Sequence, residues 1–210
     1  MTPEEIHITT RERLIHAAMR LFLEQGYSAT GVSTILREAG VNAGSLYHFF
    51  SSKEELLKAV LETYASMLDE VVMAPQRAAT PDDPVERIFT LLGWYRLGLE
   101  QTGCSLGCPI GNLALEVSDH LPEVRNWIEW NFDGWCKEIQ KWLDEASDRF
   151  PTGTDTEALS RFVLTVMEGG IMQARAEKRI EPFDHGVAHL REYLRLLMEQ
   201  PATSRVGAQS

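Results

Sequence analysis

The chain has 210 residues, of which 44% are apolar, and its mean hydropathy of −0.20 is typical of a globular protein with one large or two small domains. No apolar run approaches the roughly 18 residues of a membrane span, and residues 1–5 lack the basic and apolar regions of a secretion signal. The net charge of −11 disfavours nucleic-acid binding by the protein as a whole, and three cysteines, an odd number, argue against a disulfide framework, so we expect a cytoplasmic protein with no membrane partner.

The first helices are predicted from apolar spacing and from glycines that stop a helix. One is expected over residues 10–25, ending at Gly26, and a second, short and amphipathic, over residues 32–39, ending at Gly40. Ser52 has the features of an N-cap, with Glu55 completing a capping box, so a longer helix is predicted to follow and to run towards Met73. The apolar face of the first helix is expected to consist of Leu14, Ala17, Ala18, Leu21 and Phe22.

Residues 40–54 are the most informative stretch of the chain. A short helix, a tight turn containing glycine and a second short helix make a helix-turn-helix, whose second helix is sized for the major groove of DNA. The polar groups of that second helix are Ser45, Tyr47 and His48. Its apolar side, expected to dock against the first two helices, consists of Leu46, Phe49 and Phe50. The alternative is an ordinary pair of helices in a helical enzyme.

The same region resembles the DNA-binding domain of the TetR family of one-component repressors. The resemblance runs over residues 11–57 and is carried by IHAAMRLFLEQGY (15–27), TGVSTI (30–35), AGV (39–41), GSLYHFF (44–50) and SKEEL (52–56). Many members have a lysine where this chain has Ala43, so one phosphate contact is absent here. The residues expected to contact DNA are Ser33, Asn42, Ala43, Gly44, Ser45, Tyr47, His48 and Lys53.

Within that set, the side chains of Tyr47, His48 and Lys53 are expected on phosphates, assisted by backbone amides around Ser33 and Gly44. The others lie where base edges can be reached. The resemblance further implies a homodimer that binds a palindromic operator, represses transcription and is released by a small-molecule effector. It also implies a DNA-binding domain over residues 1–53, a ligand-binding and dimerisation domain over 54–200, and a disordered tail over 201–210.

The charge distribution agrees with a DNA-facing head on an acidic body. Residues 1–53 carry five basic and five acidic side chains, so the whole net charge of −11 lies in the rest of the chain. Phosphate contact needs local positive charge and backbone donors, and does not need a basic protein. An acidic solvated surface with no such role explains the body equally well.

Beyond residue 84 the chain is predicted to form five helices. Residues 75–84, rich in Pro, Ala, Thr and Asp, are expected to form a loop. The helices are expected over about residues 85–101, 109–118, 122–146, from 155 onwards, and 182–199. Because no β-alternation persists, the predicted fold is all-α with about nine helices, a three-helix N-terminal head and a helical C-terminal domain.

The last two predicted helices are more apolar than a single surface face requires. In the TetR family the two final helices of each subunit form a four-helix dimer interface, which this pattern resembles. The residues expected at that interface are Val166, Gly170, Ile171, Leu190, Leu194 and Leu197. A purely intramolecular core is the alternative.

The stretch GCSLGCPIGNLALEVSD, residues 103–119, resembles a Gly-Cys loop of one TetR branch, some of whose members respond to electrophiles or oxidants through the corresponding cysteine. Cys108 lies just before Pro109, at the expected start of a helix, where the dipole and free amides stabilise a thiolate. Cys108 is therefore a candidate covalent sensor, with Arg175 or Lys178 as a candidate basic partner. The alternatives are a small buried side chain, a Cys104–Cys108 disulfide, and a metal site, which the absence of further ligands at suitable spacing disfavours.

Aromatic and methionine residues gather in the predicted C-terminal helices. A cavity lined by such side chains and a few polar groups suits an apolar or aromatic effector, and the family resemblance implies one. Its expected lining is Trp94, Cys108, Asn112, Trp127, Phe132, Trp135, Met167 and Met172. The alternative is that these side chains fill a solid core.

Sequence motifs for catalysis are missing. The chain has no nucleophile elbow, no phosphate-binding glycine loop and no His-Glu-x-x-His motif, so we expect no enzyme, no cofactor and no metal. A helical adaptor that binds another protein is the remaining class.

Overall fold

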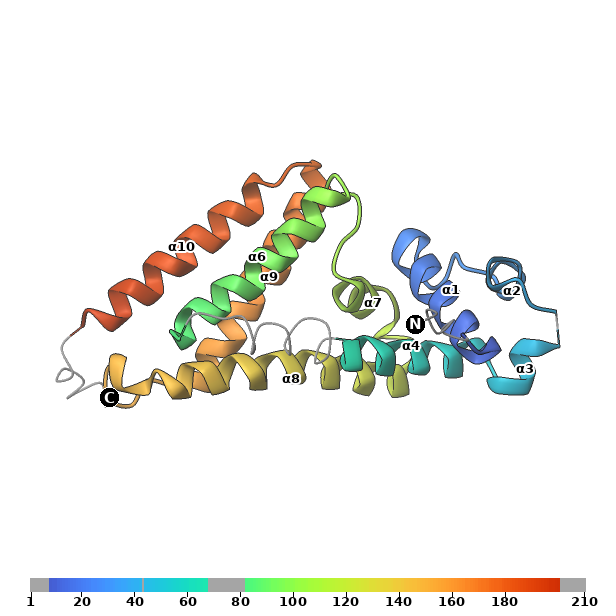
Figure 1. Cartoon of the computed structure of the whole chain (residues 1–210), viewed down its shortest axis with the longest axis horizontal. Helices are drawn as coiled ribbons and strands as arrows, with labels where there is room; N and C mark the ends of the chain where they lie inside the picture. The colour runs from blue at the N-terminus through green and yellow to red at the C-terminus, as the bar shows by residue number, and fades with distance from the viewer. Residues whose placement is uncertain (1–7, 43, 68–81, 201–210) are drawn as a thin grey trace, which may run out of the picture. The chain divides into compact units, whose positions relative to one another are not determined.

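The computed structural model describes residues 8–42, 44–67 and 82–200, and Figure 1 labels the helices there. They are α1 (Thr10–Gln25), α2 (Val32–Ala39), α3 (Ser45–Phe49), α4 (Lys53–Met67), α6 (Pro84–Gln101), α7 (Pro109–Val117), α8 (Pro122–Glu145), the short 3-10 helix η2 (Ser147–Arg149), α9 (Thr156–Glu177) and α10 (Glu181–Met198). These described ranges contain no strand, and the prediction of an all-α fold with about nine helices is confirmed.

The chain folds into two compact units, each built from two separate segments. The first unit comprises Met1–Ser66 and Pro109–Asn131, and so holds α1 to α4, α7 and the start of α8. The second comprises Met67–Cys108 and Phe132–Ser210, and holds α6, the rest of α8, α9 and α10.

These units group the chain differently from the expected division at residue 53, because tertiary bonds join α4 and α7 to the head. Tyr64 on α4 donates to the carbonyl of Met19 on α1 over 3.3 Å. Lys58 on α4 pairs with Glu123 at the start of α8 over 2.5 Å. The four apolar residues of α4 that are fully buried are Leu56, Leu57, Val60 and Leu61.

Helix α1 begins and ends as its sequence predicts. Thr9 caps it in a reciprocal box, in which the Glu12 amide donates to the Thr9 hydroxyl over 3.2 Å and the Thr9 amide donates to the Glu12 carboxylate over 2.7 Å. Gly26 ends the helix at a φ of +87°, a conformation that favours glycine. The buried face of α1 includes the five predicted residues, Leu14, Ala17, Ala18, Leu21 and Phe22.

Helix α4 is capped by Ser52, whose hydroxyl accepts from the Glu55 amide over 3.1 Å, which is one half of the predicted capping box. The Glu55 carboxylate pairs with Lys58 one turn further along. The helix is described as far as Met67. The predicted continuation towards Met73, most of the predicted loop over residues 75–84, and the predicted tail over residues 201–210 lie outside the described residues.

The predicted helices of the second half agree with the structure to within one residue at every end that was predicted. Pro84 is the first residue of α6, and the Asp83 carboxylate accepts from the Val85 amide over 2.9 Å. Asp155 caps α9 in the same manner, accepting from the Ala158 amide over 2.9 Å. Proline in the first turn and an acidic N-cap therefore set these helix starts.

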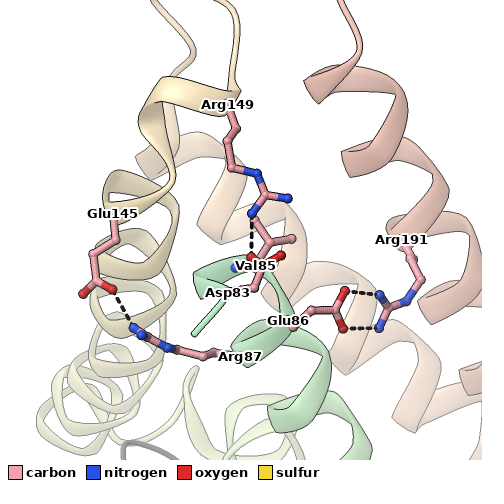
Figure 2. Close-up of polar contacts among 7 residues, drawn as sticks. All are labelled: Asp83, Val85, Glu86, Arg87, Glu145, Arg149 and Arg191. Atoms are coloured by element: carbon pink, nitrogen blue, oxygen red, sulfur yellow. Dashed lines mark hydrogen bonds and ion pairs between the residues drawn. The ribbon is translucent and has the colours of Figure 1, made fainter. Parts of the chain in front are cut away.

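Three ion pairs surround the first turn of α6 and join it to the end of α8, to η2 and to α10 (Figure 2). Arg149 donates to Asp83 over 2.6 Å, and Arg87 donates to Glu145 over 2.5 Å. Arg191 on α10 pairs with both carboxylate oxygens of Glu86, one of them at 3.1 Å. Each pair alone contributes little at a surface, and together the three connect the first turn of α6 to α8, η2 and α10.

The expected dimer residues require a correction. Helices α9 and α10 pack along each other within the chain, and a Cβ on Gly170 would lie 3.1 Å from the Phe183 ring. Five of the six residues are buried inside this one chain: Gly170, Ile171, Leu190, Leu194 and Leu197. Val166 is half-buried and faces Gly186 of α10. The apolar faces of the two helices therefore pack against each other within one chain, as the alternative of an intramolecular core predicts.

Candidate nucleic-acid interface and effector site

The turn between α2 and α3 is built around Gly40 and Arg13. Gly40 adopts a φ of +62°, and its amide and that of Val41 donate back into the last turn of α2. Arg13 on α1 donates to the carbonyl of Ala39 over 2.9 Å and to that of Gly40 over 2.6 Å. A Cβ on Gly40 would lie 2.9 Å from the Arg13 guanidinium. Arg13 therefore binds the turn to α1, and the conformation at the centre of the turn favours glycine.

Helix α3 separates an anchoring face from an exposed face. Leu46 is completely buried, and Phe50, the residue after the helix, is also buried. Tyr47 is 66% exposed, and His48 beside it is exposed as well. Phe49 is 39% exposed and packs edge-on against the His48 ring, so the expectation that it docks α3 is wrong. Because α3 has only five residues, Leu46 and Phe50 suffice to anchor it.

The structure places most of the other predicted DNA contacts on the surface. Ser33, Asn42 and Gly44 are exposed, and Ser45 is half-buried at the start of α3. Ala43 lies outside the described residues.

Lys53 differs from this group because its ammonium is engaged within the first unit. Nζ donates to the carbonyl of Tyr27 over 2.5 Å and lies 4.0 Å from the centre of the Tyr27 ring. Burial lowers the pKa of Lys53 from its ordinary value. Lys53 therefore stabilises the turn after α1, and its contact with a phosphate stays a prediction.

Two exposed cations that the sequence analysis did not select lie on α2 and on α1. Arg37 lies in the last turn of α2, and no ion pair joins it to any residue of the described ranges. The guanidinium of Arg11 lies 5.3 Å from the centre of the Phe50 ring. The place of Arg37 in the helix before the turn was the feature of the sequence that could have identified it.

The second unit contains an aromatic cluster that joins α6 to α8. The rings of Tyr95 and Trp135 are 5.7 Å apart, and those of Phe132 and Trp135 are 5.9 Å apart, both edge to face. Trp94 packs against Tyr95 at 5.0 Å but is itself 45% exposed. Of the predicted lining residues, the structure thus brings Phe132 and Trp135 into direct contact, and Tyr95 joins them on the side of α6.

Polar groups lie buried beside this cluster. The Cys108 thiol hydrogen-bonds to the Glu168 carboxyl of α9, and burial raises the pKa of Glu168. Burial also raises the pKa of Tyr95 well above its ordinary value, with Cys108 and Glu168 adding to the effect. Trp135 Nε1 and Glu168 Oε1 are buried, and neither has a hydrogen-bond partner in the described residues. Glu168, an acidic residue within an apolar helix, was a signal that the sequence analysis missed.

The remaining predicted lining residues are scattered. Met167 is buried in the core, whereas Met172 is 57% exposed and does not line an interior. Asn112 and Trp127 belong to the first unit. All three cysteines are buried and unbonded to one another, so the alternative of a Cys104–Cys108 disulfide is wrong. In the described ranges, no group of three His, Cys, Asp or Glu side chains could hold a metal ion, and no helix is long and apolar enough to cross a membrane.

Exposed apolar side chains lie on the outer faces of α9 and α10. Phe162 and Tyr193 pack edge to face at 5.4 Å, and Leu196 is exposed on α10 near them in sequence. Phe162 and Tyr193 border a surface hollow of about 390 Å³, whose floor includes Leu159 and Leu197. This face, and not the buried stripe, is available to another molecule.

Two family models match the chain. One, described as "Bacterial regulatory proteins, tetR family", covers residues 14–60 and so contains α2, the turn and α3. The other, described as "Transcriptional regulator LmrA/YxaF-like, C-terminal domain", covers residues 84–189, which is half of the chain. The chain belongs to the TetR family.

The relatives of this TetR-family regulator align with it over most of their length. The transcriptional repressor DhaR of Mycobacterium sp. strain GP1 is 29% identical over 95% of this chain and 97% of its own. The regulator YxaF of Bacillus subtilis strain 168 is 31% identical over 82% and 88%. The reduced form of Escherichia coli NemR has a TM-score of 0.76 at 25% identity, covering 88% of this chain and 96% of that one.

Proposed function

We propose that this TetR-family regulator is a repressor that binds a palindromic operator as a homodimer in the cytoplasm and has no enzymatic activity. The observation that carries the proposal is helix α3, which presents exposed Tyr47 and His48 above a completely buried Leu46. A short helix with one anchored face and one polar face can enter the major groove without disturbing the core of its domain. Relatives named as transcriptional repressors support the sign of regulation.

The proposed DNA contacts fall into two classes. Tyr47 and His48, with the amides around Ser33 and Gly44, are proposed to contact phosphates, and Arg37 is added to them. Ser45 and Asn42 are proposed to reach base edges, as is Ala43. Lys53 stabilises the turn after α1 by donating one hydrogen bond to Tyr27, and its other N–H groups can donate to a phosphate.

Substitution of Tyr47 tests this surface. Tyr47→Ala should weaken operator binding by roughly 1.5–3 kcal/mol, because a hydrogen bond to a charged phosphate is lost. The melting temperature should stay nearly unchanged, since the side chain is largely exposed. Leu115→Ala, which removes an even more exposed apolar side chain from α7 of the same unit, is the control and should leave operator affinity unchanged. Equal affinities of wild type and Tyr47→Ala would remove α3 from the interface.

Dimerisation is proposed to use the exposed faces of α9 and α10. The residues are Phe162, Met172, Tyr193 and Leu196. Burial of exposed apolar side chains drives stable association, and the hollow beside Phe162 and Tyr193 offers room for a partner side chain. This set replaces the buried residues expected from the sequence.

The effector is proposed to bind at the buried polar groups of the second unit. Trp135 Nε1 offers an unused donor and Glu168 Oε1 an unused acceptor, beside the rings of Tyr95 and Phe132. An unpaired buried polar group costs about 1–3 kcal/mol, which a ligand recovers by pairing with it. The effector class that fits is an apolar or aromatic compound carrying a group that can both accept and donate, such as a hydroxyl.

A second candidate is covalent sensing by Cys108. In its favour, NemR, a repressor of which a reduced form has been solved, is similar to this chain over most of its length. Against it, Cys108 is buried and its thiol hydrogen-bonds to Glu168, whereas reactive cysteines are usually accessible. Treatment with N-ethylmaleimide decides between the two: release from DNA in wild type and retention in Cys108→Ser would support covalent sensing, and release in both would refute it.

A further inference from the structure

The turn that joins α1 to α2 contains backbone groups that no helix satisfies. Gly26 ends α1, and the amides of Tyr27 and Ser28 follow it outside any helix. Helix α2 then begins after Gly31, which provides no side-chain cap. The direction in which α2 leaves this turn therefore depends on whatever holds residues 27–31.

A carboxylate from a distant part of the sequence binds this turn. Glu116 on α7 accepts from the Ser28 amide over 2.7 Å and from the Tyr27 amide over 2.9 Å, one bond to each carboxylate oxygen. Glu116 and the turn both lie in the first unit, where α7 packs on α1. Charge-assisted bonds of this kind are about twice as strong as bonds between neutral groups.

Gly26 makes the close approach of Glu116 possible. A Cβ at position 26 would lie 3.1 Å and 3.3 Å from the two carboxylate oxygens. The φ of +87° at Gly26 independently favours glycine. The turn is thus shaped on one side to receive the carboxylate of α7.

Lys53 holds the other side of the same peptide segment. Its Nζ donates to the carbonyl of Tyr27, and the amide of Thr30 donates to that same carbonyl over 3.1 Å. Lys53 is the first residue of α4, three residues after Phe50, which anchors the recognition helix. Tyr27 is therefore bound by α7 through its amide and by α4 through its carbonyl.

The electrostatics agree with an ionised Glu116 at this place. Burial alone would raise the pKa of Glu116, but the hydrogen bonds from Ser28 and Tyr27 and the charge of Lys53 outweigh it, and the pKa lies below its ordinary value. The bonds to the turn are then present at neutral pH and are lost only as the pH falls through that lowered pKa.

We propose that Glu116 is a positioning residue for DNA binding, which holds the turn before α2 and thereby the orientation of the whole helix-turn-helix. This inference rests on the proposed DNA-binding function of α3. Helix α7 begins with Pro109, directly after Cys108, so the segment that carries Glu116 is joined through one peptide bond to the residue that contacts Glu168.

The direction in which a charge-removing substitution changes the affinity for DNA distinguishes a positioning role of Glu116 from a purely electrostatic one. Glu116→Gln removes one negative charge, which by charge alone should strengthen binding to DNA. It also replaces one acceptor oxygen by an NH₂ donor facing an amide donor. Since a hydrogen bond to a charged group is worth roughly tenfold or more in an equilibrium constant, we expect operator binding to weaken by about tenfold.

The test uses the full chain, a fluorescent duplex selected from a random pool by the wild-type protein, and a scrambled duplex. Glu129→Gln is the matched control, because Glu129 is an exposed carboxylate on α8 of the same unit. Glu116→Gln should bind the selected duplex more weakly than Glu129→Gln but bind the scrambled duplex equally. Operator binding by Glu116→Gln at or above the affinity of Glu129→Gln overturns the inference.

A measurement on the wild-type protein covers the case in which Glu116→Gln does not fold. The amide proton shifts of Tyr27 and Ser28 should titrate together at acid pH, with a midpoint below the usual range of a glutamate. Amides that do not respond to pH overturn the contact. If the wild type enriches no duplex at all, the proposed function fails, and the titration still reports on whether Glu116 binds the turn.

Discussion

In the first unit the proposed DNA-contacting side chains stand exposed on a five-residue helix, whereas in the second unit the proposed effector-contacting groups are buried between α6, α8 and α9. Tyr47 and His48 need only a helix that is anchored correctly. Tyr95, Trp135 and Glu168 come from three helices and meet only when these helices pack. A surface site of this kind depends on local sequence, and an interior site depends on tertiary packing.

The largest expected effect compares two leucines of α10 that lie two residues apart. Leu194 is fully buried and Leu196 is 48% exposed. Leu194→Glu places an unpaired charge in the core of the second unit and should lower the free energy of unfolding by about 4 kcal/mol or more. Leu196→Glu should leave the unfolding transition almost unchanged but shift the protein towards monomer.

Chemical denaturation measures the first effect and sedimentation velocity at micromolar concentration the second. A Leu196→Glu variant that remains fully dimeric would remove the outer face of α10 from the proposed interface. If Leu194→Glu proved as stable as the wild type, the packing of α9 on α10 within one chain would be contradicted.

These leucines also show where sequence reasoning ends. The stripe of apolar residues on α10 correctly predicts which face is covered, since Leu190, Leu194 and Leu197 are all buried. It does not say whether the covering helix belongs to the same chain or to another. Helix ends were predictable because Gly26, Gly40, Pro84 and Asp155 act locally on the backbone.

The exposure and burial of the residues of the candidate DNA-binding helix α3 were also predictable in part from the sequence. The exposure of Tyr47 and the burial of Leu46 follow from their spacing on one short helix. The exposure of Phe49 does not follow, because five residues are too few to define an apolar stripe. The contact of Glu116 with Tyr27 spans 89 positions of the chain, and the contact of Cys108 with Glu168 also joins distant segments, so no local pattern indicates either.

A smaller effect is expected from the buried carboxyl of the effector site. Because burial raises the pKa of Glu168, its contribution to stability is complete below the unfolded-state value and is lost as the pH rises through the raised folded-state value. Glu168→Gln should therefore become more stable relative to the wild type as the pH rises from about 4.5 towards neutrality. Thermal melts of both proteins across this range measure the difference.

Glu138→Gln on α8 is a charge-matched control, because it replaces a carboxylate of the second unit by the same amide. A stability difference between wild type and Glu168→Gln that is constant with pH would mean that the Glu168 carboxyl is not in the buried environment described here.

The smallest effect distinguishes an exposed cation from one that is engaged inside the first unit. Arg37→Ala should reduce the slope of log affinity for operator against log salt by about one unit, as the loss of one phosphate contact does. Lys53→Ala should reduce that slope by less, because Nζ already donates to Tyr27. Anisotropy titrations at several salt concentrations give both slopes, and a larger change for Lys53→Ala would restore it as the principal phosphate ligand.

The central claim is that α3 reads an operator as one half of a symmetric dimer, and in vitro selection from a random DNA pool tests it most directly. We expect the protein to enrich palindromic sequences with half-sites about one helical turn or a little more apart. We also expect that scrambling one half-site weakens binding by several kcal/mol, towards the non-specific level. Enrichment of no sequence, or of single half-sites bound as tightly as the palindrome, would contradict this claim.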